Sequence, residues 1–527
     1  RARHGLAAMT TTLADLARAA EGRLAQGQRD PHDANVLAWH RLELGDVEGA
    51  RGWLVRALEW APNDPGTLTS MASLLRGEGR LRDAVLHCDA AIRADPGFAD
   101  AWLERAYVLA SGGSMVAARE SYARVVALVP GHGAGHAGLA SLAARDGDRV
   151  AARNHAERAL RTEPGNPIAL AALATVQIEA GEAEEARALI APALAGMPGA
   201  SNESALLANL LGDALARLGD APGAFAAYQR SNTDFLAVNS GRFGDRPAQR
   251  TMIEAVTAGL AELRPERWSA PSAIETAARP HLFLCGYPRS GNTLAENILA
   301  SIPGVSAIEE RPTMAEADHR YLAPAGGMAA LDAADEAALA ECRAAYWARV
   351  AGAGVRCAGA PLVDMDPLKS LRLPLIARLF PEARVVLTRR DPRDVVWSCF
   401  HTHFALSNAA LEFATLEGAA RHYDAVMRLT EQSMERLPLT IHVLDYHRLI
   451  ADFENETKAL CGFAGLEWSE DLRRFDRTAK ARGVSTASAG QVRKGLYDGR
   501  RQWEAFADQL APVMSILAPW VEKFGYG

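Results

Sequence analysis

Hydrophobic and polar positions follow two different patterns along the chain. Up to about residue 232, apolar residues recur at helical spacing and turn residues interrupt them at regular intervals. Farther along, short apolar runs at 282–284 and 385–387 each enter a turn, and helical spacing follows the turn. The first pattern predicts paired helices. The second predicts strands that alternate with helices, as in an α/β domain with a mainly parallel sheet.

The first part of the chain repeats every 34 residues. The repeated residues are Gly45, Gly79, Gly113, Gly147 and Gly181, then Ala50, Ala84, Ala118, Ala152 and Ala186, then Pro62, Pro96, Pro130, Pro164 and Pro198. The glycine permits a tight turn between two helices, the alanine lets the helices approach closely, and the proline ends the second helix. A sixth pair, Gly219 and Ala224, is displaced by four residues. The pattern resembles the tetratricopeptide repeat and predicts an α-solenoid over residues 1–232.

Stacked helix pairs form a superhelix with a concave groove. Two uses of the groove stay open: binding of a peptide or protein, or scaffolding and assembly, for example as a homodimer. We expect the first, because extended concave surfaces are what solenoids present to partners. Repeat character fades after residue 232, so we expect a helical linker over 233–275, rich in prolines near its end, and a second domain over 276–527.

The second domain begins with a strand, a glycine turn and a helix. In Gly286-Tyr-Pro-Arg-Ser-Gly291-Asn-Thr293 the glycines are spaced as in the phosphate-binding loop G-x-x-x-x-G-K-[ST], and Thr293 holds the hydroxyl position. Backbone N–H groups at such a helix start bind anions. Asn292 replaces the lysine that clamps the β- and γ-phosphates. The loop therefore predicts a phosphate site and disfavours a kinase that cleaves a nucleoside triphosphate.

A second strand, 384–388, leads into another turn and helix. Asp391 is placed to cap this helix, with Pro392 at its first position and Asp394 in its first turn. Arg390 lies at the carboxyl end of the strand, where open α/β sheets bind ligands. The residues alone leave open whether Arg390 and Ser398 form a second anion site or Arg390 belongs to a surface ion pair.

Together the two motifs resemble those of sulfotransferases. Residues 287–294 resemble the 5′-phosphosulfate loop of that family, and Arg390 with Ser398 resembles its 3′-phosphate motif, in which an arginine precedes a serine by eight residues. The protein-tyrosine sulfotransferases and the bacterial tetratricopeptide-repeat sulfotransferases are the most similar. The resemblance implies a three-layer P-loop-type fold, 3′-phosphoadenosine 5′-phosphosulfate (PAPS) as donor, 3′,5′-adenosine bisphosphate (PAP) as product, and no metal.

The resemblance also assigns roles to residues. Arg289 would contact the phosphosulfate and stabilise the leaving phosphate, whereas Arg390 and Ser398 would bind the 3′-phosphate. Glu310 would be the base that takes the acceptor's proton. Without the family, Glu310 would be a loop carboxylate paired with Arg311. The other nucleotide contacts implied are Ser290, Gly291, Asn292, Thr293, Leu294, Tyr446, Ser485 and Arg493. On their own, Tyr446 would be a strand-end tyrosine and Arg493 a loop charge.

One position departs from the family. A catalytic lysine is usual two residues before the proline that aligns with Pro367, and Met365 stands there. Methionine cannot donate a hydrogen bond to the departing sulfuryl oxygens. Three outcomes stay open: Lys369 reaches in from one helical turn away, Arg289 acts alone, or the domain binds nucleotide without catalysis.

Composition narrows the class of protein. The 527 residues are 49% hydrophobic and 23% charged, which is typical of a globular chain. A net charge of −7 argues against a nucleic-acid binder, and no apolar run is long enough to cross a membrane. Six scattered cysteines without C-x-x-C spacing predict reduced, mostly buried thiols and a cytoplasmic location. His401 and His403 point to different helix faces, so no metal site is expected.

These features predict a sulfotransferase that moves a sulfuryl group from PAPS to a hydroxyl of a peptide or protein, with tyrosine as the leading acceptor by resemblance. The solenoid would bind the polypeptide away from the reacting side chain. Two alternatives remain. One is a small-molecule or glycan sulfotransferase with scaffolding repeats. The other, motivated by Met365, is a non-catalytic nucleotide-binding adaptor.

Overall fold

The fold was analysed in a computed structural model. It describes residues 12–243, 248–268, 279–323, 325–355, 357, 359–482, 488–493 and 495–527. The chain divides into two compact units, residues 1–189 and residues 190–527. Each unit is described by itself.

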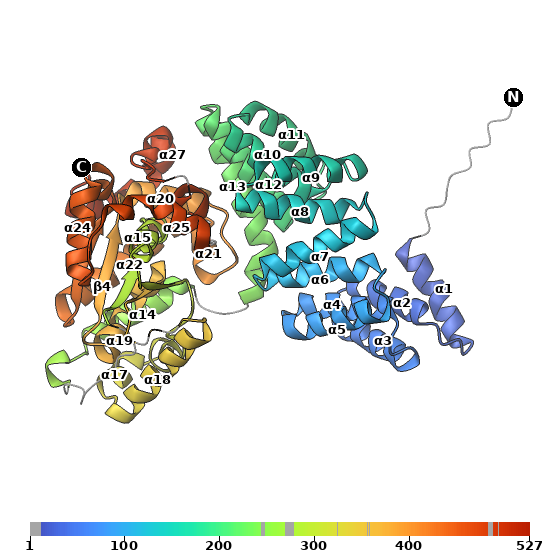
Figure 1. The fold of residues 1–527 in the computed structure, drawn as a ribbon, viewed down its shortest axis with the longest axis horizontal. Helices are drawn as coiled ribbons and strands as arrows, with labels where there is room; N and C mark the ends of the chain where they lie inside the picture. The colour runs from blue at the N-terminus through green and yellow to red at the C-terminus, as the bar shows by residue number, and fades with distance from the viewer. Residues whose placement is uncertain are drawn as a thin grey trace. The chain divides into compact units, whose positions relative to one another are not determined.

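Antiparallel helix pairs build the repeats (Figure 1). After α1 (Leu13–Ala25) the pairs are α2 (Pro31–Glu43) with α3 (Val47–Trp60), α4 (Pro65–Gly77) with α5 (Leu81–Ala94), α6 (Ala99–Ser111) with α7 (Met115–Leu128), α8 (Gly133–Asp146) with α9 (Arg149–Thr162), and α10 (Pro167–Ala180) with α11 (Ala183–Ala195). The turn glycines of all six predicted pairs have φ between +76° and +86°. The six repeat alanines are fully buried. The repeat chemistry read from the sequence is confirmed, including the displaced sixth pair.

The sixth helix pair belongs to the C-terminal unit. It consists of α12 (Asn202–Arg217) and α13 (Ala221–Asn239). Next comes α14 (Gln249–Leu260), which packs on α22 (Leu416–Arg436) and contributes to the main core of this unit. The segment expected to link two domains is thus part of a core. The domain limits at 232 and 275 stay a prediction, and residues 269–278 lie outside the described part.

A five-stranded parallel sheet forms the centre of the C-terminal unit. The strands are β1 (His281–Cys285), β2 (Ser306–Glu309), β3 (Leu362–Met365), β4 (Arg384–Arg389) and β5 (Thr440–Asp445). Their order is β2-β3-β1-β4-β5, and every neighbouring pair is parallel. The chain leaves β1 toward one edge and later returns past it to β4. The strand order therefore reverses between β1 and β4, where open α/β sheets form their ligand crevice.

Helices cover both faces of the sheet. Along β1, Phe283 and Cys285 belong to the core that α14, α19 (Leu373–Leu379), α20 (Pro392–His401) and α22 share. Leu282 and Leu284 point to the opposite core, with α15 (Asn292–Ala300), α24 (Phe453–Ala464) and α25 (Phe475–Arg482). This alternation follows from the period of two in a strand. The predicted fold class, an α-solenoid followed by a three-layer α/β domain, is confirmed.

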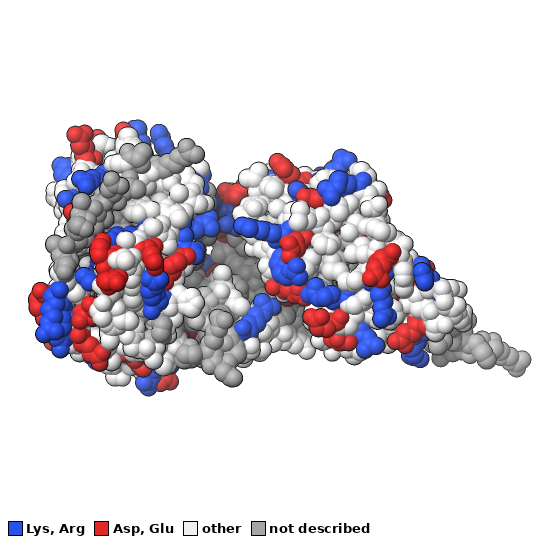
Figure 2. All heavy atoms as spheres, turned by 90° about the horizontal axis from the view of Figure 1, so that it is seen from below, with Lys and Arg blue, Asp and Glu red and all other residues white. Residues whose placement is uncertain are grey.

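The remaining helices are mostly connections around this framework. They are α16 (Ala315–Ala317), α17 (Gly327–Asp332), α18 (Glu336–Gly352), α21 (Asn408–Phe413), α23 (Tyr446–Ala451), α26 (Ala489–Val492), α27 (Ala507–Leu510) and α28 (Met514–Lys523). All six cysteines are buried and none forms a disulfide. No helix of the described segments is both long and apolar enough to cross a membrane. Basic and acidic side chains are interspersed on the face that Figure 2 shows.

A buried ion pair ties β3 to the segment that follows it. Lys369 and Asp364 are 1% and 0% exposed, and their charged groups are in contact. The Asp364 carboxylate also accepts hydrogen bonds from Thr313 (2.7 Å) and Tyr346 (3.1 Å), and Lys369 Nζ donates to Thr313 Oγ1 (3.1 Å). His281 Nε2 lies 2.7 Å from the Tyr346 hydroxyl, and burial lowers the pKa of His281 to about 3, so this ring is neutral. The network joins β1, β3, α18 and the loop after β2.

The ion pair makes a stability prediction. Lys369→Met should lower the free energy of unfolding by about 3–5 kcal/mol, because it leaves a buried carboxylate without its counter-charge. Adding Asp364→Asn to the same chain removes that charge and should recover part of the loss. Urea denaturation of the C-terminal unit measures both effects.

Lys458→Met is the matched control. Lys458 pairs with Glu454 at 2.6 Å on the exposed side of α24, and exposed pairs of this kind contribute little. Similar losses for Lys369→Met and Lys458→Met would contradict the role of the buried pair.

Candidate active site

The loop between β1 and α15 is tightly docked on β4. Gly286 N donates to Pro367 O at 3.0 Å, and a Cβ at Gly286 would collide with Thr388. The loop turns through two left-handed residues, Arg289 (φ +69°) and Gly291 (φ +106°). Within the described residues, no side chain caps α15, which begins at Asn292. The N–H groups in the first turn of such a helix suit an anion.

Two side chains of the loop hold the loop itself. Ser290 Oγ donates to Tyr287 O (2.6 Å) and lies 2.7 Å from Thr388 Oγ1. Asn292 Nδ2 donates to Tyr287 O (2.8 Å), and its Oδ1 accepts from Thr388 Oγ1 (3.0 Å). Asn292 is therefore engaged inside the protein, at 3% exposure. Its contact with a ligand would come from the backbone N–H, as for the rest of the loop.

Arg289 connects the loop to the second motif. Its Nε donates to Ser398 Oγ at 2.9 Å, Nη1 donates to Ser488 Oγ at 2.6 Å, and Nη2 lies 3.4 Å from Gln491 Oε1. Burial lowers the pKa of Arg289 to about 10, so the guanidinium remains charged at neutral pH. Two motifs that are about 100 residues apart in the sequence meet at this side chain.

Arg390 lies beside it at the carboxyl end of β4. Its Nη1 donates to Arg289 O at 3.1 Å, its Nη2 donates to Gly499 O, and its guanidinium carbon lies 5.0 Å from the centre of the Tyr446 ring. Arg390 is 8% exposed, and its Nε has no hydrogen-bond partner among the described residues. A buried cation with a spare donor fits an anionic ligand.

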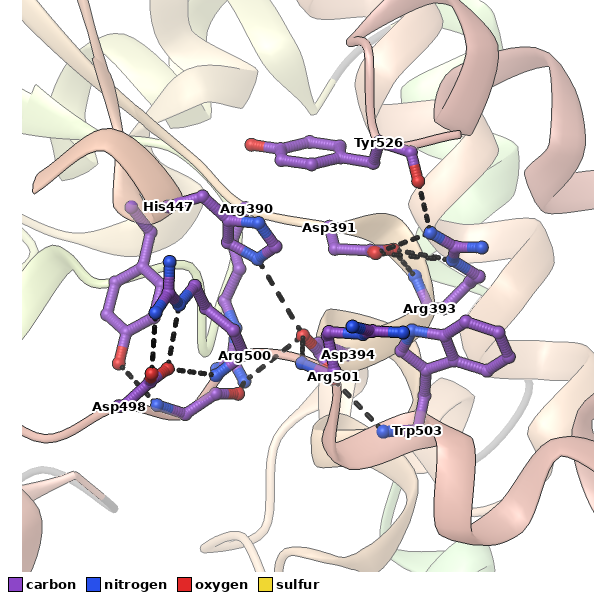
Figure 3. A network of polar contacts seen from close by, with 12 residues as sticks. Arg390, Asp391, Arg393, Asp394, His447, Asp498, Arg500, Arg501, Trp503 and Tyr526 are labelled. Atoms are coloured by element: carbon purple, nitrogen blue, oxygen red, sulfur yellow. Dashed lines mark hydrogen bonds and ion pairs between the residues drawn. The ribbon is translucent and has the colours of Figure 1, made fainter. Parts of the chain in front are cut away.

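The acids of the second motif are structural. Asp391 accepts from Arg393 N at 2.9 Å and caps α20, as predicted. Asp394 is fully buried and accepts from the N–H groups of Arg501 (2.9 Å) and Trp503 (3.1 Å) (Figure 3). Burial opposes its charge, but His447, Arg390 and these N–H groups outweigh burial and lower the pKa of Asp394. Asp394 thereby anchors the segment after residue 497 next to Arg390.

Both motifs face one pocket. Tyr446 closes one side, because its hydroxyl donates to Tyr497 O (2.7 Å) and accepts from Gly499 N (3.2 Å). The described residues lining the pocket are Arg289, Gly291, Thr293, Leu294, Arg390, Tyr446, Ser488, Gln491, Val492, Gly495, Tyr497 and Gln502. Sequence reasoning missed Ser488, Gly495, Tyr497 and Gln502, which belong to no motif. The glycines at 495 and 499 were the one local signal of a turn there.

Some of the predicted residues lie elsewhere. Ser398 contacts Arg289 from α20 without lining the pocket, and Ser290 and Asn292 stay within the loop and do not line it either. Arg493 is half-buried and is not among the lining residues. Ser485 falls in 483–487, outside the described residues. The roles assigned to these residues stay predictions.

Glu310 follows β2 at the same edge of the sheet. Its N–H donates to Met365 O at 2.8 Å, its φ is +47°, and its side chain reaches the surface. The pKa of Glu310 is raised to about 7. Partial burial is the main cause, and the negative charges of Asp366, Glu309 and Glu296 add to it. In the described part of the chain, no ion pair joins it to Arg311. Two strand spacings of about 4.8 Å separate β2 from β1, so Glu310 lies roughly 10 Å along the edge from the loop strand.

Neither Met365, which stands at the position of the missing lysine, nor Lys369, one helical turn away, lines the pocket. Met365 is fully buried in the core beside α15. Lys369 is on the other face of the sheet, with its ammonium 5.7 Å from the Phe283 ring and paired with Asp364. No lysine is present among the described lining residues. Among the described lining residues, the positive charge comes from Arg289 and Arg390.

Both parts of the chain match models of known protein families. Residues 280–470 match the model of the sulfotransferase family. Residues 69–132 and 143–210 match models of the tetratricopeptide repeat. These matches do not single out the protein-tyrosine sulfotransferases.

Similar proteins were also found among sequences and solved structures. An uncharacterized protein of Aquifex aeolicus (strain VF5) is 30% identical over 252 residues, 46% of this chain and 33% of the relative, so the chain spans about a third of that protein. The thermophilic tetratricopeptide-repeat protein TTC0263 of Thermus thermophilus matches at 21% identity and a TM-score of 0.31, over 34% of this chain and 98% of its own. The type IV pilus biogenesis factor PilW matches at 16% identity and a TM-score of 0.34, over 39% and 93%.

The repeat assignment rests on the family models. Residues 280–470 form a sulfotransferase-family domain, C-terminal to an array of tetratricopeptide repeats.

Proposed function

We propose that the domain transfers a sulfuryl group from PAPS to the hydroxyl of an acceptor and releases PAP. The observation that carries the proposal is the single pocket to which the loop after β1 contributes Arg289 and the turn after β4 contributes Arg390. Arg289 and the first turn of α15 suit the 5′-phosphosulfate. Arg390, with its spare Nε, suits the 3′-phosphate, and Ser398 contributes through its hydrogen bond with Arg289.

The proposed transfer step uses Glu310 as the base and Arg289 as the cation beside the leaving phosphate. The acceptor oxygen attacks sulfur, the bond from sulfur to the 5′-phosphate oxygen breaks, and the hydroxyl proton passes to Glu310. Negative charge develops on the leaving phosphate, where Arg289 would stabilise it. In this proposal two guanidinium groups and backbone N–H groups balance the charge of the donor, so no metal is invoked.

A polypeptide acceptor is supported by the repeat unit. It contains a pocket of about 210 Å³ lined by residues of α6, α7, α8 and α10, among them Tyr107, Tyr122, Gly138 and Ser141. Such a pocket suits a side chain of an extended peptide. Tyrosine as the sulfated residue is proposed from the resemblance of the loop and of Glu310. The rival use of the repeats, scaffolding or homodimer assembly, predicts that changes in this pocket leave transfer unaffected.

The adaptor alternative has its own support in Met365 and in the pairing of Lys369 with Asp364. It predicts nucleotide binding without transfer. A measurement of sulfuryl transfer by the wild type distinguishes the adaptor from the enzyme.

The first prediction concerns the donor pocket. Wild-type protein should bind PAP, and Arg390→Gln should weaken binding by about 10- to 100-fold, because charge-assisted hydrogen bonds to the 3′-phosphate are lost. Isothermal titration calorimetry measures the Kd. Arg393→Gln is the matched control, since Arg393 lies three residues farther along, in the first turn of α20, and contacts Asp391 and Trp503 instead of the pocket. Absence of PAP binding by the wild type would refute the proposed function.

The second prediction concerns the base. Glu310→Gln should keep PAP affinity and lower kcat by about 10²- to 10⁴-fold. For the wild type, kcat/KM should fall about tenfold per pH unit below pH 7 and level off above it, because the protonated carboxyl cannot accept a proton. Asp366→Asn removes a neighbouring negative charge, so it should lower the pKa of Glu310 and move this acid limb to lower pH. Full activity of Glu310→Gln would exclude the base.

The third prediction concerns the repeat pocket. Ser141→Arg places a long cation in the pocket and should lower kcat/KM for a tyrosine-containing peptide about tenfold, equivalent to about 1.4 kcal/mol, while transfer to a small phenol stays unchanged. Ser111→Arg, at the exposed end of α6 and outside the pocket lining, is the matched control. Unchanged transfer to both acceptors would favour scaffolding repeats.

A further inference from the structure

The C-terminal end of α20 is held by side chains. The last carbonyls of a helix lack partners within the helix, and the structure describes no backbone hydrogen bond at the C-cap of α20. Trp397 O lies 2.9 Å from His401 Nδ1, and Ser398 O accepts from Thr402 Oγ1 at 2.6 Å. The last two carbonyls, of Phe400 and His401, have partners from far away in the sequence.

Those partners are two asparagines of the sixth helix pair. Asn232 Nδ2 donates to Phe400 O at 2.9 Å, and Asn209 Nδ2 donates to His401 O at 2.7 Å. Asn209 lies on α12 and Asn232 on α13, 192 and 168 residues from their acceptors. The N–H of an amide carries a partial positive charge, so it also interacts favourably with the negative, C-terminal end of the helix dipole.

Aromatic packing holds the same two elements together. Trp397 of α20 stacks against Phe225, with ring centres 6.3 Å apart, and meets Tyr228 edge-on at 5.8 Å. Phe225 and Tyr228 both belong to α13. The sixth pair therefore contacts α20 through one apolar and one polar layer, and the polar layer fixes the rotation and height of the helix end.

The position of α20 decides the position of Ser398. Ser398 is in the last turn of α20, two residues before Phe400, and its hydroxyl accepts from Arg289 Nε at 2.9 Å. A shift of the helix end would move this hydroxyl and release the guanidinium of Arg289. The opposite end of α20 is fixed separately, by Asp391 and Asp394.

We propose that Asn209 and Asn232 are positioning residues for the donor pocket. The sixth helix pair would then contribute to donor binding, because it holds the end of α20 that carries Ser398. The inference rests on the proposed role of Arg289 and Ser398 in donor binding. The asparagines do not contact the donor; they act through the carbonyls of α20.

The experiment uses the full chain with Asn209→Asp, Asn232→Asp and both changes together. Aspartate has nearly the same shape but offers no donor, and its negative charge faces a carbonyl oxygen. The double variant should weaken PAP binding about tenfold by calorimetry, as expected for loss of roughly one to two net hydrogen bonds. The KM for PAPS should rise accordingly, while the KM for the acceptor and the acid limb of the pH profile stay unchanged.

Asn239→Asp is the matched control. Asn239 is 2% exposed on α13, and in the described residues its amide donates within the sixth pair, to Asn202 Oδ1 (2.9 Å) and Phe235 O (3.0 Å). This variant should destabilise the pair and leave PAP affinity at the wild-type level. Thermal unfolding and circular dichroism confirm which variants are folded. Should the double aspartate variant not fold, Asn209→Ala and Asn232→Ala remove the donors without adding charge and give the same comparison.

Three results would overturn the proposal. PAP affinity of the folded Asn209 and Asn232 variants within twofold of the wild type would exclude positioning while leaving the proposed function intact. An equal loss of affinity in Asn239→Asp would show that the effect is general destabilisation. Failure of the wild type to bind PAP would refute the proposed function and this inference together.

Discussion

The docking of the glycine loop on Thr388 is the contact on which the candidate site depends. The Thr388 hydroxyl lies against Ser290 and Asn292, and only a glycine at 286 lets the two strand ends approach this closely. With that contact made, the turn after β1 and the turn after β4 open on the same side. Arg289, which follows β1, and Arg390, which follows β4, then line the same pocket.

The repeats were the most predictable part, because each repeat makes its contacts with its nearest neighbours. One glycine with positive φ and one buried alanine per pair fix the turn and the crossing distance, and both can be read at a constant period. The two strand–turn–helix motifs were likewise local. Their meeting at one pocket followed from the rule that parallel strands of an open sheet carry ligands at their carboxyl ends.

Long-range partners could not be read from the sequence. The sequence allows Lys369 to replace the missing lysine, but in the structure Lys369 pairs with Asp364. This pairing joins β3 to the following turn within a core, and no local pattern indicates it. Asp394 had a sufficient explanation as a first-turn acid, yet it anchors Arg501, 107 positions later. The helix at 249–260 had the right periodicity, but its place in the core depends on α22, which no local pattern indicates.

The engagement of Asn292 has a consequence for a lysine at this position of the loop. Its amide both donates and accepts inside the protein, at 3% exposure. A lysine ammonium at this position offers no acceptor to replace the asparagine carbonyl, so Thr388 Oγ1 would lose one of its partners and keep Ser290 Oγ and Cys285 O. An Asn292→Lys change would therefore remove one of the contacts that dock the loop on β4, so the asparagine that stands in place of the lysine stabilises the loop from within.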